Sequence, residues 1–295
     1  IDVTEAVYIS KYPELYKKIK EDGDNLAGAG REFGRVFKRT RILNNITVQL
    51  YATIAARPKE LSVFKPKRKG GLIELTGKDV KEAYTSVIKS MKWVKRILKS
   101  KFFLINDKTI VTDYPVIVAC SYWRHCEARG DTPDIGATAR WLAISIFRNR
   151  YAGKNTNTKM DEDLKIVAKN PKPWGDLNGK LGKGNEKFSD DDLGKWGDKL
   201  QNPSKTWIGS LYTANLLWKN AVDPLSLIPL RSIDGDKRTK EMEWHHIFPK
   251  SLFASDKDLA SLSFVKKNES VINHIGNMSH ITKESNRRIS NSHPT

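Results

Sequence analysis

Between Asp79 and Lys101, apolar residues recur at steps of three and four, and this period constrains the fold more than any other feature of the chain. They are Val80, Ala83, Tyr84, Val87, Met91, Val94 and Leu98. The spacing gathers side chains on one face of an α-helix, whereas a strand would alternate. Further helices are expected over 111–129, 135–151 and 206–220. The first part of the chain is therefore predicted to be a mainly α-helical domain.

The composition changes twice further along the chain. Six of the 19 glycines fall between residues 170 and 200, which predicts a loop or an irregular insertion. Around Asp223, prolines and a polar run break the helical pattern, and short extended pieces follow. We therefore predict a helical, basic domain over residues 1–222, with a glycine-rich insertion near 170–200, and a smaller domain over residues 223–295.

The chain of 295 residues carries a net charge of +18, with 52 Lys and Arg against 34 Asp and Glu. Such an excess predicts a polyanionic partner, either nucleic acid or an anionic membrane surface. We do not expect a membrane-spanning protein, because the longest apolar run, Val116–Cys120, is far shorter than the roughly 18 residues that a span requires. The two cysteines, Cys120 and Cys126, cannot make a disulfide framework or a four-ligand zinc site, which indicates a reducing compartment. We therefore expect a cytoplasmic protein.

A basic stripe runs along the segment 79–101, beside its apolar face. It consists of Lys89, Lys92, Arg96 and Lys99. Two more basic clusters lie nearby in sequence, within 35–41 and 65–69. Such a stripe is either a solvated helix face or a surface that contacts phosphates. We take Lys92, Arg96 and Lys99 as candidate DNA contacts.

Nucleotide hydrolysis through a P-loop is not expected. The chain has five Gly-Lys pairs, and none is followed by the Ser or Thr whose hydroxyl binds magnesium. The His-Glu-x-x-His motif of the common helical zinc proteases is also absent from the sequence.

Histidines concentrate at the end of the chain, where five of the six fall in the last 51 residues. Two of them, His245 and His246, are adjacent in the run Glu-Trp-His-His-Ile-Phe-Pro. Adjacent residues on a strand point to opposite faces. The two histidines can therefore serve two roles in one site only at the end or at a bend of a strand. Pro249 would end or bend the strand here. Downstream, Asn286 follows Asn277 by nine residues.

Asn286 is expected near the start of a short helix. Thr282 is a suitable N-cap for that helix, and Glu284 would lie in its first turn.

At these residues the sequence resembles the HNH, or ββα-metal, endonucleases, in which a hairpin and a helix hold one divalent cation. The resemblance implies that His245 and Asn286 are metal ligands and that both act in catalysis with His246, the general base. It implies that Asn277 braces the hairpin. Glu243 matches the acidic residue that supports the site in colicin-type nucleases. The implied fold is a mainly α-helical domain followed by a small α+β ββα-metal finger.

The implied cofactor is Mg²⁺ or Mn²⁺, with Zn²⁺ or Ni²⁺ as alternatives, and the implied substrate is DNA. Arg287, Arg288 and Lys250 lie close to these motifs in sequence and are candidate phosphate contacts. From Leu230 onward the chain has 11 basic and 8 acidic residues, a net +3, so most of the charge lies in the helical part. We expect that part to supply most of the DNA affinity.

A wider resemblance is to the C-terminal nuclease part of GmrSD-type modification-dependent restriction enzymes and their phosphorothioate-sensing relatives. Besides the nuclease motifs, Arg140-Trp141 and the run 148–153 resemble the helical segment that precedes the nuclease there. The resemblance implies an effector in antiviral restriction. It also implies a nucleotide-dependent regulatory domain N-terminal to this chain, because the Asp-Gly-Gln-Gln-Arg motif of that domain is absent from the sequence.

Two other functions remain open from the sequence. The first is a non-catalytic nucleic-acid-binding module with a structural metal site. The second is a colicin-like toxin nuclease, although Ser290 stands where colicins have a further His. His274, His280 and His293 are expected to be surface or packing residues, with His280 the strongest candidate for an exception.

Overall fold

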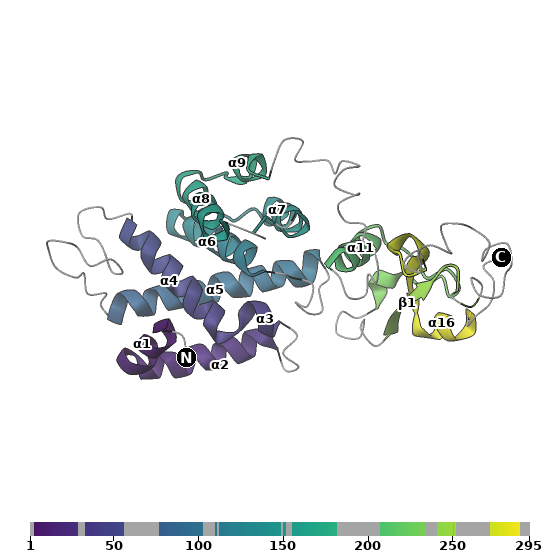
Figure 1. Ribbon diagram of the computed structural model, residues 1–295, viewed down its shortest axis with the longest axis horizontal. Coiled ribbons are helices and arrows are strands. Elements are labelled where there is room, and N and C mark those ends of the chain that lie inside the picture. Colours follow the sequence, from purple (N-terminus) through teal and green to yellow (C-terminus); the bar gives the residue numbers. More distant parts are fainter. Residues whose placement is uncertain are drawn as a thin grey trace. The chain divides into compact units, whose positions relative to one another are not determined.

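The computed structural model describes residues 3–28, 33–55, 77–102, 110, 112–148, 150–151, 155–181, 207–233, 241–249, 251 and 272–289. These residues are mostly helical and include a small antiparallel sheet of two strands, which agrees with the coarse fold class expected from the sequence (Figure 1). The chain divides into two compact units. The first contains Ile1–Ile97 and Ile110–Gly182, and the second contains Leu98–Thr109 and Lys183–Thr295.

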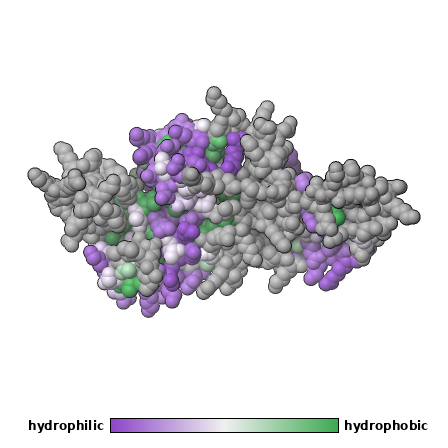
Figure 2. Space-filling view, viewed as in Figure 1, coloured by the Kyte–Doolittle hydropathy of each residue, from purple (hydrophilic) through white to green (hydrophobic). Residues whose placement is uncertain are grey.

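The first unit is built from helices. They are α1 (Val3–Lys11), α2 (Pro13–Ala27), α3 (Gly34–Phe37), α4 (Arg39–Ala55), α5 (Gly77–Lys101, whose last turn belongs to the second unit), α6 (Tyr114–Arg129), α7 (Ile135–Phe147), α8 (Thr156–Lys169) and α9 (Trp174–Gly179). Part of the glycine-rich segment is therefore helical, since α9 lies within it, and residues 182–200 of that segment lie outside the described residues. On the face shown in Figure 2, the described surface is largely hydrophilic.

Helix α5 follows the apolar period read from the sequence. Val87, Met91 and Val94 on its apolar face are fully buried. Lys95 Nζ donates to the main-chain oxygen of Leu26 at 2.6 Å, and the Tyr84 hydroxyl donates to an Asp22 carboxylate oxygen, so two polar contacts join α5 to α2. No described helix has the length and apolarity to cross a membrane.

A buried ionic network joins the end of α7 to α8. Asp163 is fully buried and accepts from Arg150 Nε and Nη2, both at 2.6 Å, and from the Tyr151 hydroxyl at 2.5 Å. Arg150 Nη1 also donates to the main-chain oxygen of Lys180 at 2.8 Å. Burial and the nearby Asp163 carboxylate raise the pKa of Tyr151, which stays protonated and keeps donating. Arg150 and Tyr151, which lie in the run 148–153 of the wider resemblance, therefore tie the segment after α7 to α8.

Replacing Asp163 with Asn should destabilise the first unit by about 3–5 kcal/mol, because it leaves the largely buried Arg150 side chain without its counter-charge. Urea unfolding followed by circular dichroism measures the change. The matched control is Asp161→Asn, since Asp161 is exposed on the same helix. Equal stability of the two variants would contradict the role assigned to the network.

The second unit places a two-stranded sheet between two helices. Its described elements are α11 (Trp207–Trp218), η3 (Leu230–Ser232), β1 (Met242–His246), η5 (Ile275–Asn277), β2 (Met278–Thr282) and α16 (Lys283–Ile289). The strands are antiparallel, and their register pairs Met242 with Thr282 and His246 with Met278. The predicted boundary near residue 222 falls inside this unit, after α11.

Helix α11 covers one face of the sheet. Trp244 stacks on Tyr212 with ring centroids 5.8 Å apart, and His280 lies 4.0 Å from the Trp244 ring centroid. Thr213 Oγ1 lies 2.8 Å from His280 Nε2. A small apolar core continues this packing, formed by Leu217, Leu230, Ile233 and Met242. The opposite face, with Glu243 and His245, packs against α16.

Candidate functional site

The hairpin and α16 bring three predicted site residues into one chain of hydrogen bonds. His245 Nδ1 lies 2.7 Å from Asn286 Oδ1, and Asn286 Nδ2 donates to Glu243 Oε2 at 2.6 Å. Strand alternation puts Glu243 and His245 on the same face of β1. Because α16 begins directly after β2, its first turn delivers Asn286 to that face. All three side chains are partly exposed.

Glu243 determines which atom Asn286 presents to His245. An ionised carboxylate only accepts hydrogen bonds, so the amide nitrogen of Asn286 faces Glu243 and the amide oxygen faces the imidazole. In a neutral ring, His245 Nδ1 then carries the proton and donates it to that oxygen. A divalent cation could take the place of this proton, since an imidazole nitrogen such as His245 Nδ1 and an amide oxygen such as Asn286 Oδ1 both ligate divalent cations.

The distance between the two atoms also fits a cation. Adjacent ligands of an octahedral cation with bonds of about 2.1 Å lie roughly 3 Å apart. The separation of 2.7 Å between His245 Nδ1 and Asn286 Oδ1 is within a few tenths of an ångström of this value. Among the described residues, no group of three or more His, Cys, Asp or Glu side chains is arranged to hold a metal. The candidate site therefore offers one imidazole nitrogen and one amide oxygen.

His246 lies on the other face of β1 and has a different partner. Its Nε2 lies 3.0 Å from Asn273 Oδ1. An amide oxygen accepts, so Nε2 carries the proton in the neutral ring and Nδ1 holds the lone pair. Nδ1 is thus the ring atom able to take a proton from water. No sequence motif marks Asn273, which lies 27 residues from His246 and was therefore not predicted as a site residue.

Asn277 closes the connection between the two strands. Its Nδ2 donates to the main-chain oxygens of Phe248 at 3.1 Å and Ile272 at 2.9 Å, and its Oδ1 accepts from Phe248 N at 2.8 Å. Its main-chain oxygen accepts from Ile247 N at 2.9 Å. One side chain thereby ties the end of β1 to the segment that leads into β2.

Asp223 is a second residue that the sequence analysis missed as part of the site. It is fully buried, and its carboxylate accepts from Thr282 N and the Ser285 hydroxyl, both at 2.6 Å. It also accepts from Leu225 N at 3.0 Å and Ser226 N at 2.8 Å. The bonds from Leu225 and Ser226 lie within the loop that follows α11, and the other two join this loop to the end of β2 and the first turn of α16. Burial alone would raise the pKa of Asp223, but the hydrogen bonds outweigh it and hold the pKa well below the usual range.

Thr282 caps α16 as expected, because its Oγ1 accepts from Ser285 N at 3.2 Å. His274 and His280, which are described, contribute no side-chain hydrogen bond to the chain of Glu243, Asn286 and His245. Burial lowers the pKa of His280 to about 4, so this ring is neutral where it packs between β2 and α11. His274 Nδ1 accepts from Gly276 N at 3.1 Å, and His293 lies outside the described residues.

The predicted phosphate contacts have different surroundings. Arg287 and Arg288 are exposed on α16, and Lys92, Arg96 and Lys99 are exposed on α5. Lys250 lies outside the described residues, as do residues 65–69 of the second basic cluster.

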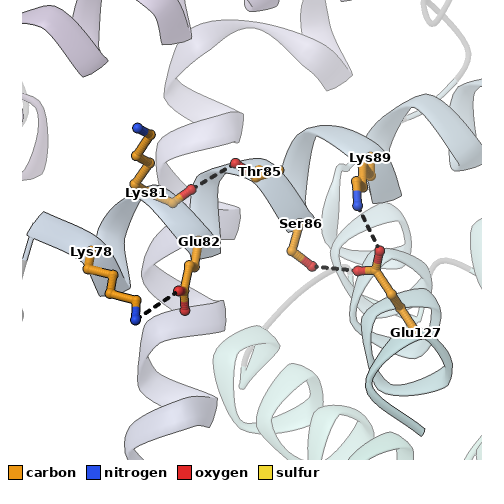
Figure 3. Close-up of a pocket in the computed structure, with 7 residues that line it drawn as sticks. All are labelled: Lys78, Lys81, Glu82, Thr85, Ser86, Lys89 and Glu127. Carbon is orange, nitrogen blue, oxygen red and sulfur yellow. Dashed lines mark hydrogen bonds and ion pairs between the residues drawn. The ribbon is translucent and has the colours of Figure 1, made fainter. Parts of the chain in front are cut away.

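Several other cations are paired with carboxylates. In the first basic cluster, Arg39 pairs with Glu5 at 2.6 Å and Arg41 with Asp113 at 3.2 Å. A shallow cavity of about 400 Å³ along α5 is lined by Lys78, Lys81, Glu82, Thr85, Ser86, Lys89 and Glu127. Figure 3 shows Lys89 and Ser86 reaching Glu127, and Lys78 reaching Glu82. Because two of its three lysines face carboxylates, this cavity is a weaker anion site than its lysines alone would indicate.

Comparison of the chain with protein-family models, with curated proteins and with solved structures gives no match. The function therefore has to be inferred from the residues of the site.

Replacing Asp223 with Asn should destabilise the second unit by about 3 kcal/mol near neutral pH, because an amide cannot accept all four hydrogen bonds and brings a donor against other donors. The folded-state pKa of Asp223 lies below its unfolded value of about 4. Its contribution is therefore present above about pH 4 and is lost as the pH falls through the folded-state pKa. Urea unfolding followed by tryptophan fluorescence between neutral and acidic pH measures both effects.

As the pH falls, the Asp223→Asn variant should lose less stability than the wild type, because it has no carboxylate at position 223 to be protonated. Glu241→Gln, which removes an exposed carboxylate next to β1, is the control and should follow the wild type. If Asp223→Asn and the wild type lose stability in parallel, Asp223 is not the buried anion described above.

Proposed function

We propose that this protein is a divalent-metal-dependent DNA endonuclease of the HNH type, which nicks or cleaves phosphodiester bonds. One observation carries the proposal. At the end of a short hairpin, His245, Asn286 and Glu243 form a hydrogen-bonded chain on one face, and the adjacent His246 lies on the other face with its own amide partner. Two adjacent imidazoles in different surroundings suit two different tasks.

His246 would act as the general base. Phosphodiester hydrolysis requires a water molecule to lose a proton, and a neutral imidazole removes it well near neutral pH, a contribution on the order of 10²–10⁴ in rate. Nδ1 would take that proton. Asn273 would keep Nε2–H bonded and so hold the ring in the tautomer and orientation that leave Nδ1 ready to accept.

His245 Nδ1 and Asn286 Oδ1 would hold the cation, with Mg²⁺ or Mn²⁺ preferred and Zn²⁺ or Ni²⁺ as alternatives. When bound, such a cation stabilises the negative charge that develops on the phosphate and on the leaving oxygen. Glu243 would keep the amide oxygen of Asn286 directed at the site. Asn277 and Asp223 would fix the hairpin end and the helix that carry these ligands.

DNA is the substrate class that the charge favours. The chain carries +18, and Arg287 and Arg288 are exposed one and two residues after Asn286. The resemblance to modification-dependent restriction enzymes supports a role as the effector part of an antiviral restriction protein in the cytoplasm. A nucleotide-dependent regulatory domain would then act on this part in the full-length protein.

Incubation with supercoiled plasmid tests the proposal. The wild type should nick or linearise the plasmid with Mg²⁺ or Mn²⁺ and stop in EDTA. His246→Ala should lose cleavage by about 10²–10⁴ in rate while binding Mn²⁺ almost normally, as measured by calorimetry. His245→Ala and Asn286→Ala should weaken Mn²⁺ binding, and Glu243→Gln should weaken it by about 10–100-fold, because the amide of Asn286 loses its fixed orientation.

The control is His125→Ala, which removes a histidine of the helical unit and should change neither cleavage nor Mn²⁺ binding. Unchanged nicking by His246→Ala would overturn its role as base. If EDTA unfolds the second unit instead of stopping cleavage by a folded protein, the metal is structural and the non-catalytic alternative is favoured.

Salt dependence tests the contribution of α5 to DNA binding. Replacing Lys92, Arg96 and Lys99 with Gln should make the slope of log K for DNA binding against log salt concentration less steep. The slope should change by about 0.9 for each phosphate that the variant no longer binds. Fluorescence anisotropy with a labelled duplex in EDTA measures the slope. A slope equal to that of the wild type would mean that this stripe is a solvated face.

A matched triple variant controls for the loss of charge. Lys165, Lys169 and Lys172 are exposed in and just after α8, and replacing them with Gln removes the same number of positive charges. If both triple variants flatten the slope equally, the effect comes from net charge and not from the α5 stripe.

A further inference from the structure

The loop 222–229, between α11 and η3, exposes apolar side chains instead of burying them. Leu227 is 70 % exposed, and Val222, Leu225 and Ile228 are 42–47 % exposed. Exposed apolar residues that cluster in one short segment point to an interaction surface, whereas single ones are ordinary. Leu227 also has a φ of +57°, in the left-handed region that side chains other than Gly, Asn and Asp rarely adopt.

Hydrogen bonds hold this loop in its unusual conformation. Asp223 N donates to the main-chain oxygen of Ile228, and Leu227 N donates to that of Asp223, both at 2.9 Å. An antiparallel bridge between Val222 and Pro229 closes the base of the loop. The Asp223 carboxylate fills its interior by accepting from the main chain of Leu225 and Ser226. The loop is therefore built to present Leu225, Leu227 and Ile228 outward.

The loop is also joined to the proposed catalytic site. The same carboxylate of Asp223 binds the Ser285 hydroxyl, and Ser285 directly precedes Asn286. A force on the loop is thus transmitted through one buried side chain to the helix that carries a proposed metal ligand.

The charge around the loop favours a nucleic acid over a protein as its partner. Between Lys219 and Ile233, Asp223 is the one acidic residue, and it is buried, whereas Asp234 and Asp236 follow in the sequence and Glu284 is exposed on α16. Lys219 and Arg231 flank the loop, and both are exposed. Arg288, also exposed, lies about one helical turn after Ser285. Apolar side chains between cations match the surface of proteins that insert Leu, Ile or Phe between base steps while binding the phosphates on either side.

We propose that the loop 222–229 is a DNA wedge, which inserts Leu225, Leu227 and Ile228 between base pairs and locally unstacks duplex DNA. The choice of DNA as partner rests on the proposed function. Unstacking bends and widens the duplex, which brings more of the backbone against the protein. The wedge would thereby position a phosphate beside the hairpin end, and it would act without metal.

The linking number of a plasmid reports unwinding of the duplex by such a wedge, whatever DNA sequence the protein binds. A closed circular plasmid is relaxed in EDTA by a topoisomerase that needs no metal, in the presence of the full chain, and the protein is then removed. Local unstacking unwinds the duplex, so the recovered plasmid should carry a reduced linking number that grows with the amount of protein bound. Binding is measured in parallel by filter retention.

The test variant combines Leu225→Ser with Leu227→Asn. Asn tolerates the left-handed backbone at position 227, so the variant should fold with at least wild-type stability in urea. It should still bind plasmid through its basic residues but lose about half or more of the linking-number shift. The control Ile135→Ser changes an apolar residue of the helical unit that is 38 % exposed, and it should keep the full shift.

The outcomes separate the wedge from the nuclease. Loss of the shift in the folded, DNA-binding double variant supports the wedge. A full shift in that variant overturns it, and so does a wild type that binds and nicks plasmid without unwinding it, although nuclease function then stands. A wild type that neither binds nor nicks DNA overturns both proposals. If the double variant changes only the oligomeric state, seen by sedimentation, the loop is a protein contact and the wedge is wrong.

Discussion

The described part of the second unit depends on one buried carboxylate. Asp223 accepts hydrogen bonds from the loop that contains it, from the last residue of β2 and from the first turn of α16. The loop precedes the end of β2 and the start of α16 by about 60 residues of chain. A buried anion requires such donors, and the donors fix the positions of the segments in return.

The geometry of the hairpin explains how two neighbouring histidines acquire different partners. Alternation along β1 turns His245 toward α16 and His246 toward Asn273. Each ring then meets an amide oxygen, but His245 does so through Nδ1 and His246 through Nε2. The sheet itself contributes little more than this alternation. The specificity of the site comes from the amide side chains and from Glu243, which orients one of them.

The sequence predicted the elements that leave a local pattern. The period of α5, the cap at Thr282 and the nine-residue step from Asn277 to Asn286 are short-range features, and the described helices follow the first two. The partners Asn273 and Asp223 were missed because a hydrogen bond across 27 or 62 residues leaves no periodic signal.

The same limit applies to charge. A run of cations in the sequence does not reveal its counter-ions, which come from distant elements. Lys89 belongs to the basic stripe by spacing, yet it pairs with Glu127 from α6. Packing also joins α11 to the sheet that follows it, through Tyr212 and Thr213.

This assignment of α11 bears on which fragment of the chain can be transplanted. A helix as short as α16, with seven residues, is not stable by itself in water, and a two-stranded hairpin is marginal. Both gain their stability here from Asp223 and from the face of α11. An excised piece that begins at β1 would therefore retain every proposed ligand and still lack the means to hold them. A portable form of the site would need to include α11, a helix that contributes none of the proposed catalytic atoms.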